Sequence, residues 1–183
     1  MNMALFHFQT GDYQRALAFH GAALEIWTRE YGADNYPRMG EGYLNLGSDL
    51  LRLGSPELAL EHFDHASTVM KRHHSESYFQ LPFVDYAKGM AFLEMGNADS
   101  CRYWIDQALL GIEQQNMPVL QYLAGKCDLA LGDLEFRKGN LEAAFVLYQT
   151  AQQILVNIAG PNNTHTIRSD LKQVLWWKEK GEL

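Results

Sequence analysis

The side chains most able to bind a metal ion in this sequence are four histidines within one short region. His62 and His65 are three residues apart, so on a helix they share one face, and His73 and His74 follow shortly after. Imidazole nitrogens at this spacing can bind one transition-metal ion together. A solvated helix face gives the same pattern, however, and no third ligand recurs at a fixed spacing. We therefore expect neither a metal site nor another cofactor.

The two cysteines, Cys101 and Cys127, are the candidate nucleophiles. Cys101 stands at a small-residue position of a helix–helix contact, where a thiol packs as a small hydrophobe, and Cys127 has no His near it in the sequence that would activate a thiol. Their spacing fits neither a disulfide framework nor a zinc site. Gly125 and Lys126 do not form a phosphate-binding loop, because Leu120 stands at the upstream glycine position and Cys127 at the Ser or Thr position. The sequence therefore favours a protein that is not an enzyme.

Charge and hydropathy narrow the partners and the compartment. The chain has 15 Lys and Arg against 22 Asp and Glu, a net charge of −7, which makes a phosphate backbone an unfavourable partner. No run of roughly 18 or more apolar residues is present, so we expect no membrane partner and no membrane-spanning segment. With two cysteines and no signal-like apolar segment at its start, the chain is predicted to be cytoplasmic.

Four glycines mark the elements that position these side chains. They are Gly11, Gly54, Gly96 and Gly139, separated by 43, 42 and 43 residues. Each is followed by a residue that is preferred as a helix N-cap, namely Asp12, Ser55, Asn97 and Asn140. The spacing predicts that each glycine ends a first helix in a left-handed conformation and that the next residue begins a second helix. A steady period of this length is typical of a solenoid.

Small side chains recur at fixed distances from these glycines. Twelve residues after them come Ala23, Ala66, Ala108 and Ala151, five residues after them come Ala16, Ala59, Cys101 and Ala144, and seven residues before them come Ala4, Gly47, Gly89 and Gly132. A larger residue stands nine after each glycine: His20, Phe63, Ile105 and Tyr148. Small residues at matching points let two helix axes approach closely. Histidine at the bulky position predicts poorer packing in the first repeat.

The pattern resembles the tetratricopeptide repeat, and the resemblance covers almost the whole chain. It is carried by "GDYQRALAFHGAAL", "GSPELALEHFDHAS", "GNADSCRYWIDQAL" and "GNLEAAFVLYQTAQ". The family's small, Gly, Ala, bulky and Ala positions fall on Gly47, Gly54, Ala59, Phe63 and Ala66. The family's usual unit has about 34 residues, and the longer unit here resembles the repeats of kinesin light chains and many bacterial regulators. The resemblance implies an all-α fold, a right-handed superhelix of helix pairs.

The expected repeats cover residues 1–30, 38–75, 81–115 and 119–159, with a terminal helix over 164–180, all in one domain. Counting back from Gly11, the first helix begins before Met1, which suggests a segment of a longer array; alternatively, the terminal helix caps the last repeat. Trp176 and Trp177 together exceed what one buried stripe needs, so we expect at least one to be exposed or packed against another copy. Self-association through the terminal helices is therefore possible.

In proteins of this kind the first helices line a concave groove that takes an extended peptide or a partner helix. Carried over by position, the partner-binding residues are Leu44, Asn45, Ser48, Phe83, Tyr86, Met90, Lys126, Leu129 and Asp133. The same register adds charged residues of both signs, namely Glu41, Arg52, Glu94, Arg137, Arg168 and Lys172. The apolar strip of Phe83, Tyr86, Met90 and Leu93 suits an amphipathic helix or a hydrophobic peptide. Alternatively, these side chains pack against the neighbouring helices.

One known binding mode of the family is disfavoured. The clamp that grips the C-terminal carboxylate of heat-shock chaperones needs a first lysine where Leu44 and Tyr86 stand, and only Asn45 matches its asparagine. The leading hypothesis is thus a non-catalytic protein-protein interaction module that binds a peptide or helix in its groove. The alternative is a ligand- or peptide-sensing regulatory domain of a larger bacterial regulator.

Overall fold

The computed structural model describes residues 3–115 and 117–181, and within them every regular element is a helix. In chain order they are α1 (Met3–Gln9), α2 (Tyr13–Tyr31), α3 (Met39–Arg52), α4 (Pro56–His73), α5 (Leu81–Glu94), α6 (Ala98–Gln115), α7 (Pro118–Arg137), α8 (Leu141–Ala159) and α9 (Thr164–Lys180). The all-α prediction is confirmed. Residues 1 and 2 of the expected first repeat lie outside the described ranges.

The four periodic glycines end α1, α3, α5 and α7 as predicted. Their φ angles are 82° at Gly11, 80° at Gly54, 73° at Gly96 and 81° at Gly139, the left-handed region that glycine enters without a Cβ penalty. The N–H of the residue after each glycine donates to the carbonyl five residues earlier, as from Ser55 to Leu50, which closes the helix end. The same hydrogen bond therefore closes the first helix of every repeat.

In repeats two to four, the first helix packs closely against the second helix at a glycine, which has no side chain. A Cβ built on Gly47 would lie 2.5 Å from the ring of Phe63, one on Gly89 would lie 2.6 Å from Ile105, and one on Gly132 would meet the ring of Tyr148. The small residues of the second helices are buried, with one exception. Ala23 is half-buried, because α1 begins eight residues before its glycine whereas α3 begins fifteen before.

The expectation of poorer packing at His20 is wrong. His20 is buried, and its Nδ1 lies 2.7 Å from Oδ2 of the fully buried Asp49 on α3. Phe63 and Tyr148 pack on a glycine in the first helix of their own repeat, whereas His20 bonds to the first helix of the next repeat. The second carboxylate oxygen of Asp49 has no hydrogen-bond partner among the described residues. The first repeat therefore holds its neighbour through a polar group in an apolar interior.

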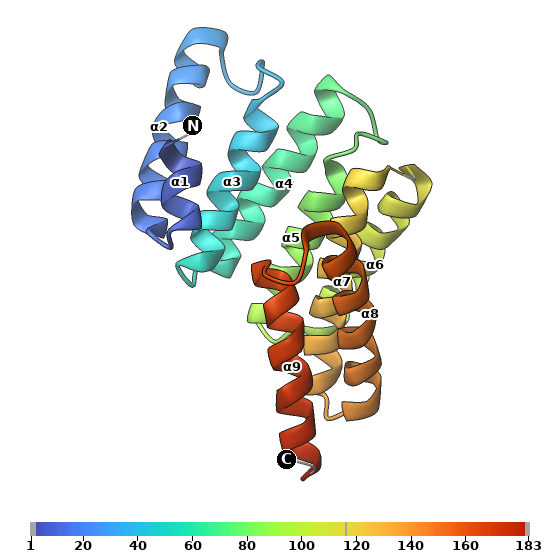
Figure 1. The fold of residues 1–183 in the computed structure, drawn as a ribbon. Helices are drawn as coiled ribbons and strands as arrows, with labels where there is room; N and C mark the ends of the chain where they lie inside the picture. Colours follow the sequence, from blue (N-terminus) through green and yellow to red (C-terminus); the bar gives the residue numbers. More distant parts are fainter. Residues whose placement is uncertain (1–2, 116, 182–183) are drawn as a thin grey trace.

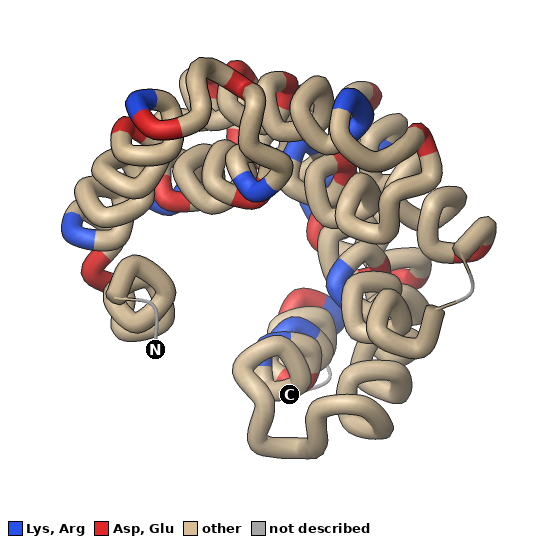
Figure 2. Tube along the Cα trace, turned by 90° about the horizontal axis from the view of Figure 1, so that it is seen from above, with Lys and Arg blue, Asp and Glu red and all other residues tan. Residues whose placement is uncertain are grey.

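The helix pairs follow one another in chain order, and α9 packs on α8 (Figure 1). Figure 2 shows that they form an open arc, with the two chain ends on its open side. The first helices of successive repeats contact one another, α3 with α5 and α5 with α7. On α9, Trp176 is buried with its ring 4.2 Å from that of Phe145, whereas Trp177 is 38% exposed. This agrees with the expectation that one of the two tryptophans is exposed.

Candidate functional site

The apolar residues predicted for the groove serve both the surface and the core. Phe83, Tyr86 and Met90 on α5 are half-buried, and all three pack against the core between α6 and α7. Leu44 on α3 is likewise half-buried and packs against the core beneath α4. These side chains thus form a fixed floor that is partly open to a ligand.

Four other predicted residues differ in what they offer a partner. Asn45 is exposed, and the hydroxyl of Ser48 donates to the carbonyl oxygen of Leu44 at 2.8 Å. Leu129 and Asp133 are only 3% and 5% exposed. Leu129 belongs to the core between α7 and α8, so in this conformation it has almost no surface to give a ligand. Asp133 has internal partners, described below, and acts by holding other side chains.

Lys126 on α7 is the most unusual group of the concave face. Its Nζ lies 4.5 Å from the centroid of the Tyr86 ring, a cation–π contact. It forms no ion pair with any described residue. Burial, together with the guanidinium groups of Arg52 and Arg168, lowers the pKa of Lys126 to about 8. An anion that entered here would find an ammonium group with no carboxylate to compete for it.

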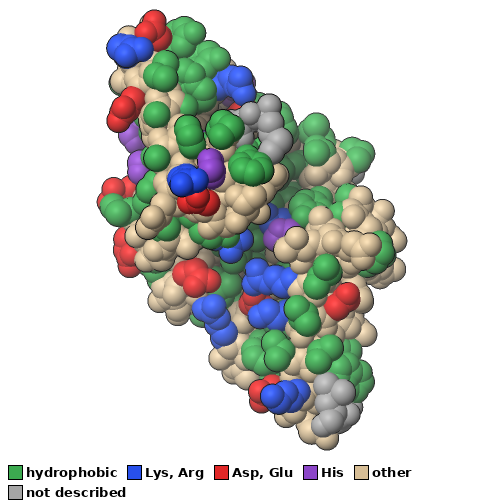
Figure 3. All heavy atoms as spheres, turned by 60° about the vertical axis from the view of Figure 1, so that its left-hand side comes forward, with side chains coloured by type: hydrophobic (Ala, Val, Ile, Leu, Met, Phe, Trp, Pro, Cys, Tyr) green, Lys and Arg blue, Asp and Glu red, His purple; other side chains and the backbone are tan. Residues whose placement is uncertain are grey.

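Lys126 belongs to a group of basic side chains that we call the basic cluster: Arg52 of α3, Lys126 of α7, and His165, Arg168 and Lys172 of α9. Asp133 holds Arg168 and Lys172 in place, since Nη2 of Arg168 lies 2.6 Å from Oδ2 and Nζ of Lys172 lies 2.9 Å from Oδ1. The hydroxyl of Tyr148 also donates to Asp133, at 3.0 Å. Figure 3 shows Lys and Arg side chains gathered in the hollow at the middle of this face, beside a histidine.

The electrostatics of the basic cluster favour an anionic ligand. Burial and the positive charges of Lys126, Arg168 and Arg52 lower the pKa of His165 to about 4, so its ring is neutral at pH 7. Asp133 is the one carboxylate that forms ion pairs with the cluster in the described part of the chain. Several cations thus share one anion, although the chain as a whole has a net charge of −7.

The residues first considered for chemistry are placed elsewhere. Both cysteines are buried; burial raises the pKa of the Cys101 thiol to about 11 and raises that of Cys127 further, so neither is a thiolate at pH 7. His62 and His65 both stack on the ring of Tyr43. Within residues 3–115 and 117–181, no group of three or more His, Cys, Asp or Glu side chains is arranged to hold a metal ion.

The family comparison agrees with this geometry. Residues 1–72 match the model of the tetratricopeptide repeat family, and the fold of the remaining helix pairs repeats that of the matched ones. The chain is an array of helix pairs, of which residues 1–72 are similar to the tetratricopeptide repeat. Such arrays are generally protein-protein interaction modules, with each repeat contacting its neighbours and the stack presenting an extended concave surface.

Solved structures of similar fold extend the likeness of this repeat array over nearly its full length. The crystal structure of BtubC (BKLC) from P. vanneervenii is 16% identical, with a TM-score of 0.73, over 98% of this chain and 70% of that one. Nearly identical TPR-like repeats of a protein named as a kinesin light chain from Podosopora anserina are 12% identical, with a TM-score of 0.60, over 98% of this chain and 84% of that one. No curated protein matches the sequence significantly.

None of the described helices of the repeat array combines the length and the apolar character needed to cross a lipid bilayer.

The sequence pattern had already placed Arg52, Lys126, Arg168 and Lys172 on the concave side, but it did not show that they converge. That convergence depends on how far the superhelix turns between α3 and α9, which no local motif encodes.

Proposed function

We propose that this repeat array is a non-catalytic module that binds an acidic segment of a partner protein in its concave groove. The observation that carries the proposal is the unpaired Lys126, which lies over the Tyr86 ring beside Arg52 and Arg168. A carboxylate of the partner would pair with these cations, while apolar side chains beside it would lie along Phe83 and Met90.

The energetic case rests on desolvation. Lys126 is already largely removed from water in the free protein, as its lowered pKa indicates. A ligand carboxylate therefore gains an ion pair for which one partner has been desolvated in advance. The same cluster would repel a basic segment, so it favours acidic partners over basic ones.

A peptide-binding assay tests the proposal. Fluorescence anisotropy would compare a labelled peptide library of alternating acidic and apolar residues with a matched library in which Asp and Glu are replaced by Asn and Gln. We expect the acidic library to bind and the amide library to bind at least tenfold more weakly, with affinity falling as salt is added.

Variants locate the binding surface. Lys126→Gln and Tyr86→Ala should each weaken the acidic library, whereas Arg72→Gln removes a cation from the exposed end of α4 and should leave binding unchanged. If the amide library bound equally well, or if Arg72→Gln had the same effect as Lys126→Gln, the acidic-segment proposal would be wrong. Circular dichroism of each variant confirms that the helices are intact.

A further inference from the structure

A second pocket lies away from the basic cluster, between the second helices of repeats two and three. It has a volume of about 340 Å³ and is lined by α4, α5, α6 and the loop before α5. Its walls include the rings of Tyr103 and Trp104 on α6, and Asp85 and Lys88 on α5 form part of its floor. None of these residues belongs to the predicted concave groove or to the basic cluster.

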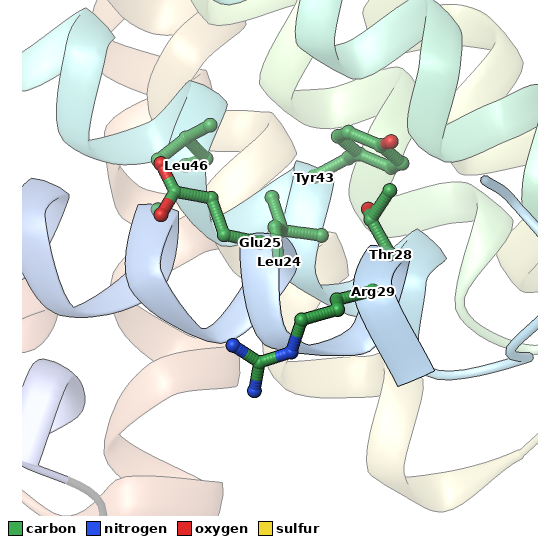
Figure 4. A pocket seen from close by; sticks show the side chains of 7 residues that line it. Leu24, Glu25, Thr28, Arg29, Tyr43 and Leu46 are labelled. Carbon is green, nitrogen blue, oxygen red and sulfur yellow. The ribbon is translucent and has the colours of Figure 1, made fainter. Parts of the chain in front are cut away.

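The same place in repeat two is also hollow, although a different residue stands there. Asp85 stands eleven residues before its periodic glycine, where repeat two has Tyr43. The Tyr43 ring stacks on His65 of α4 with centroids 4.6 Å apart. Figure 4 shows the pocket of repeat two, lined by Tyr43 and Leu46 on α3 and by Leu24 of α2, with Arg29 pointing away. The pocket of repeat three differs in having the Asp85 carboxylate where repeat two has the Tyr43 ring.

Among the charged side chains that line this pocket, the Asp85 carboxylate is the one that forms no ion pair with a described residue. Nζ of Lys88 lies 2.6 Å from Asp64 and 4.2 Å from the centroid of the Trp104 ring, so its ammonium is already bound on two sides. Lys71 pairs with Glu76 at 2.7 Å. Asp85 forms no hydrogen bond or ion pair with any described residue, although it is partly buried.

A second acceptor in the same pocket also lacks a donor. Oε1 of Gln115, at the end of α6, is buried and has no hydrogen-bond partner among the described residues. Its Nε2 donates only to the carbonyl of Tyr78, at 3.5 Å. Buried acceptors are normally paired, and leaving one unpaired costs about 1–3 kcal/mol. The pocket thus offers one buried acceptor without a donor, a carboxylate that forms no ion pair with a described residue, and two aromatic rings. The ammonium groups of Lys71 and Lys88 act on Asp85 only at longer range, because each is paired with another carboxylate.

We propose that this pocket binds an organic cation, a guanidinium or a primary ammonium group, with the Asp85 carboxylate as its counterion and Gln115 Oε1 accepting another N–H of the same ligand. A guanidinium fits this set well, because it is planar, rich in donors and stacks on aromatic rings. The cation belongs either to a free small molecule or to an arginine side chain of a bound protein; both present the same chemistry.

An NMR titration of the ¹⁵N-labelled chain tests the proposal. The probes are N-acetyl-arginine amide, which presents a side chain flanked by peptide groups, and butylguanidinium, which has none. N-acetyl-citrulline amide, of the same shape as the first but neutral, is the control. The indole N–H of Trp104, assigned with Trp104→Phe, and the side-chain amide of Gln115 should shift with the two cations and remain still with citrulline.

A matched pair of variants separates the pocket from general charge effects. Asp128 occupies the same repeat position as Asp85 one repeat later, and burial raises the pKa of each carboxyl to about 6, but Asp128 does not line this pocket. Asp85→Asn should weaken cation binding at least tenfold, whereas Asp128→Asn should leave it unchanged. Both substitutions remove a partly buried charge, so both variants should fold.

The pH dependence gives an independent readout. Binding should weaken between pH 7.5 and pH 5, because Asp85 becomes protonated. The other ionisable groups that line the pocket are Lys71, Glu76, Lys88 and the Tyr103 hydroxyl. Tighter binding of N-acetyl-arginine amide than of butylguanidinium would identify a protein side chain as the source, and the reverse would identify a free cation. Equal shifts with citrulline, or undiminished binding by Asp85→Asn, would overturn the proposal.

Discussion

The lowered pKa of Lys126 predicts how binding in the groove depends on pH. The ammonium form of Lys126 attracts a carboxylate and the neutral amine does not, so affinity should fall as pH rises through about 8. With this pKa, roughly ten in eleven molecules are protonated at pH 7 and roughly one in eleven at pH 9. The Kd for an acidic peptide should therefore rise about tenfold between these pH values.

The histidine and the arginines of the basic cluster do not change their charge between pH 7 and pH 9, so they leave this change in Kd unaffected. His165 is neutral throughout the range because its pKa is about 4, and arginine guanidinium groups remain protonated. Anisotropy titrations at pH 7, 8 and 9 at constant ionic strength would measure the profile. Lys126→Met should flatten it, whereas Lys172→Gln should weaken binding but keep the slope, since Lys172 is paired with Asp133.

A ligand-free measurement checks the premise. The ε-carbon of Lys126, one of seven lysines, can be followed by NMR in a chain labelled with ¹³C-lysine and assigned with Lys126→Met. We expect it to titrate about two pH units below an ordinary lysine, which titrates near 10.4. Titration of Lys126 above pH 10, or a Kd that is the same at pH 7 and pH 9, would refute the reasoning.

Three further predictions concern stability, each measured by urea denaturation. Gly132→Ala should cost about 1–3 kcal/mol by overpacking. Gly21→Ala, whose added Cβ would meet its nearest atom at 4.0 Å, should instead stabilise the chain by about 0.5–1 kcal/mol, because glycine is unfavourable inside a helix. His20→Phe should cost about 3 kcal/mol by stranding the buried Asp49, and the double variant with Asp49→Leu should regain most of it. The free energy of unfolding should decrease as the pH rises from 4 to 6, in part because the pKa of Asp128 in the folded chain, about 6, exceeds its value in the unfolded chain. Asp128→Asn should therefore stabilise the chain by about 1–3 kcal/mol at pH 7.5 and by little at pH 4.

The helix order could be predicted from the sequence because its signals are local. A glycine at a left-handed turn, a capping residue after it and small residues at fixed offsets each act within a few residues, and they agree across the repeats. Pairing between buried polar groups could not be predicted in this way. His20 and Asp49 are 29 residues apart, and each alone reads as an exception to its repeat position.

The candidate site was predictable only as a list of positions. Register placed Tyr86 and Lys126 on first helices that face inward, and the structure brings them into contact. The same register also selected Leu129, which is buried, because a helix face does not reveal how closely the next helix covers it. Asp85 was overlooked since it lies on the other side of α5, where the resemblance implied no site.

The charge arrangement has a consequence for the kinetics of encounter. At physiological salt the field of a charge decays over about 8 Å, so an acidic chain experiences the cations of the basic cluster only once it is close to the groove, and most other charges of this chain, whose net charge is −7, are screened from it. The cluster therefore acts on the lifetime of the complex more than on the rate of encounter. Added salt should shorten that lifetime, so the groove would select partners by how long they remain rather than by how fast they arrive.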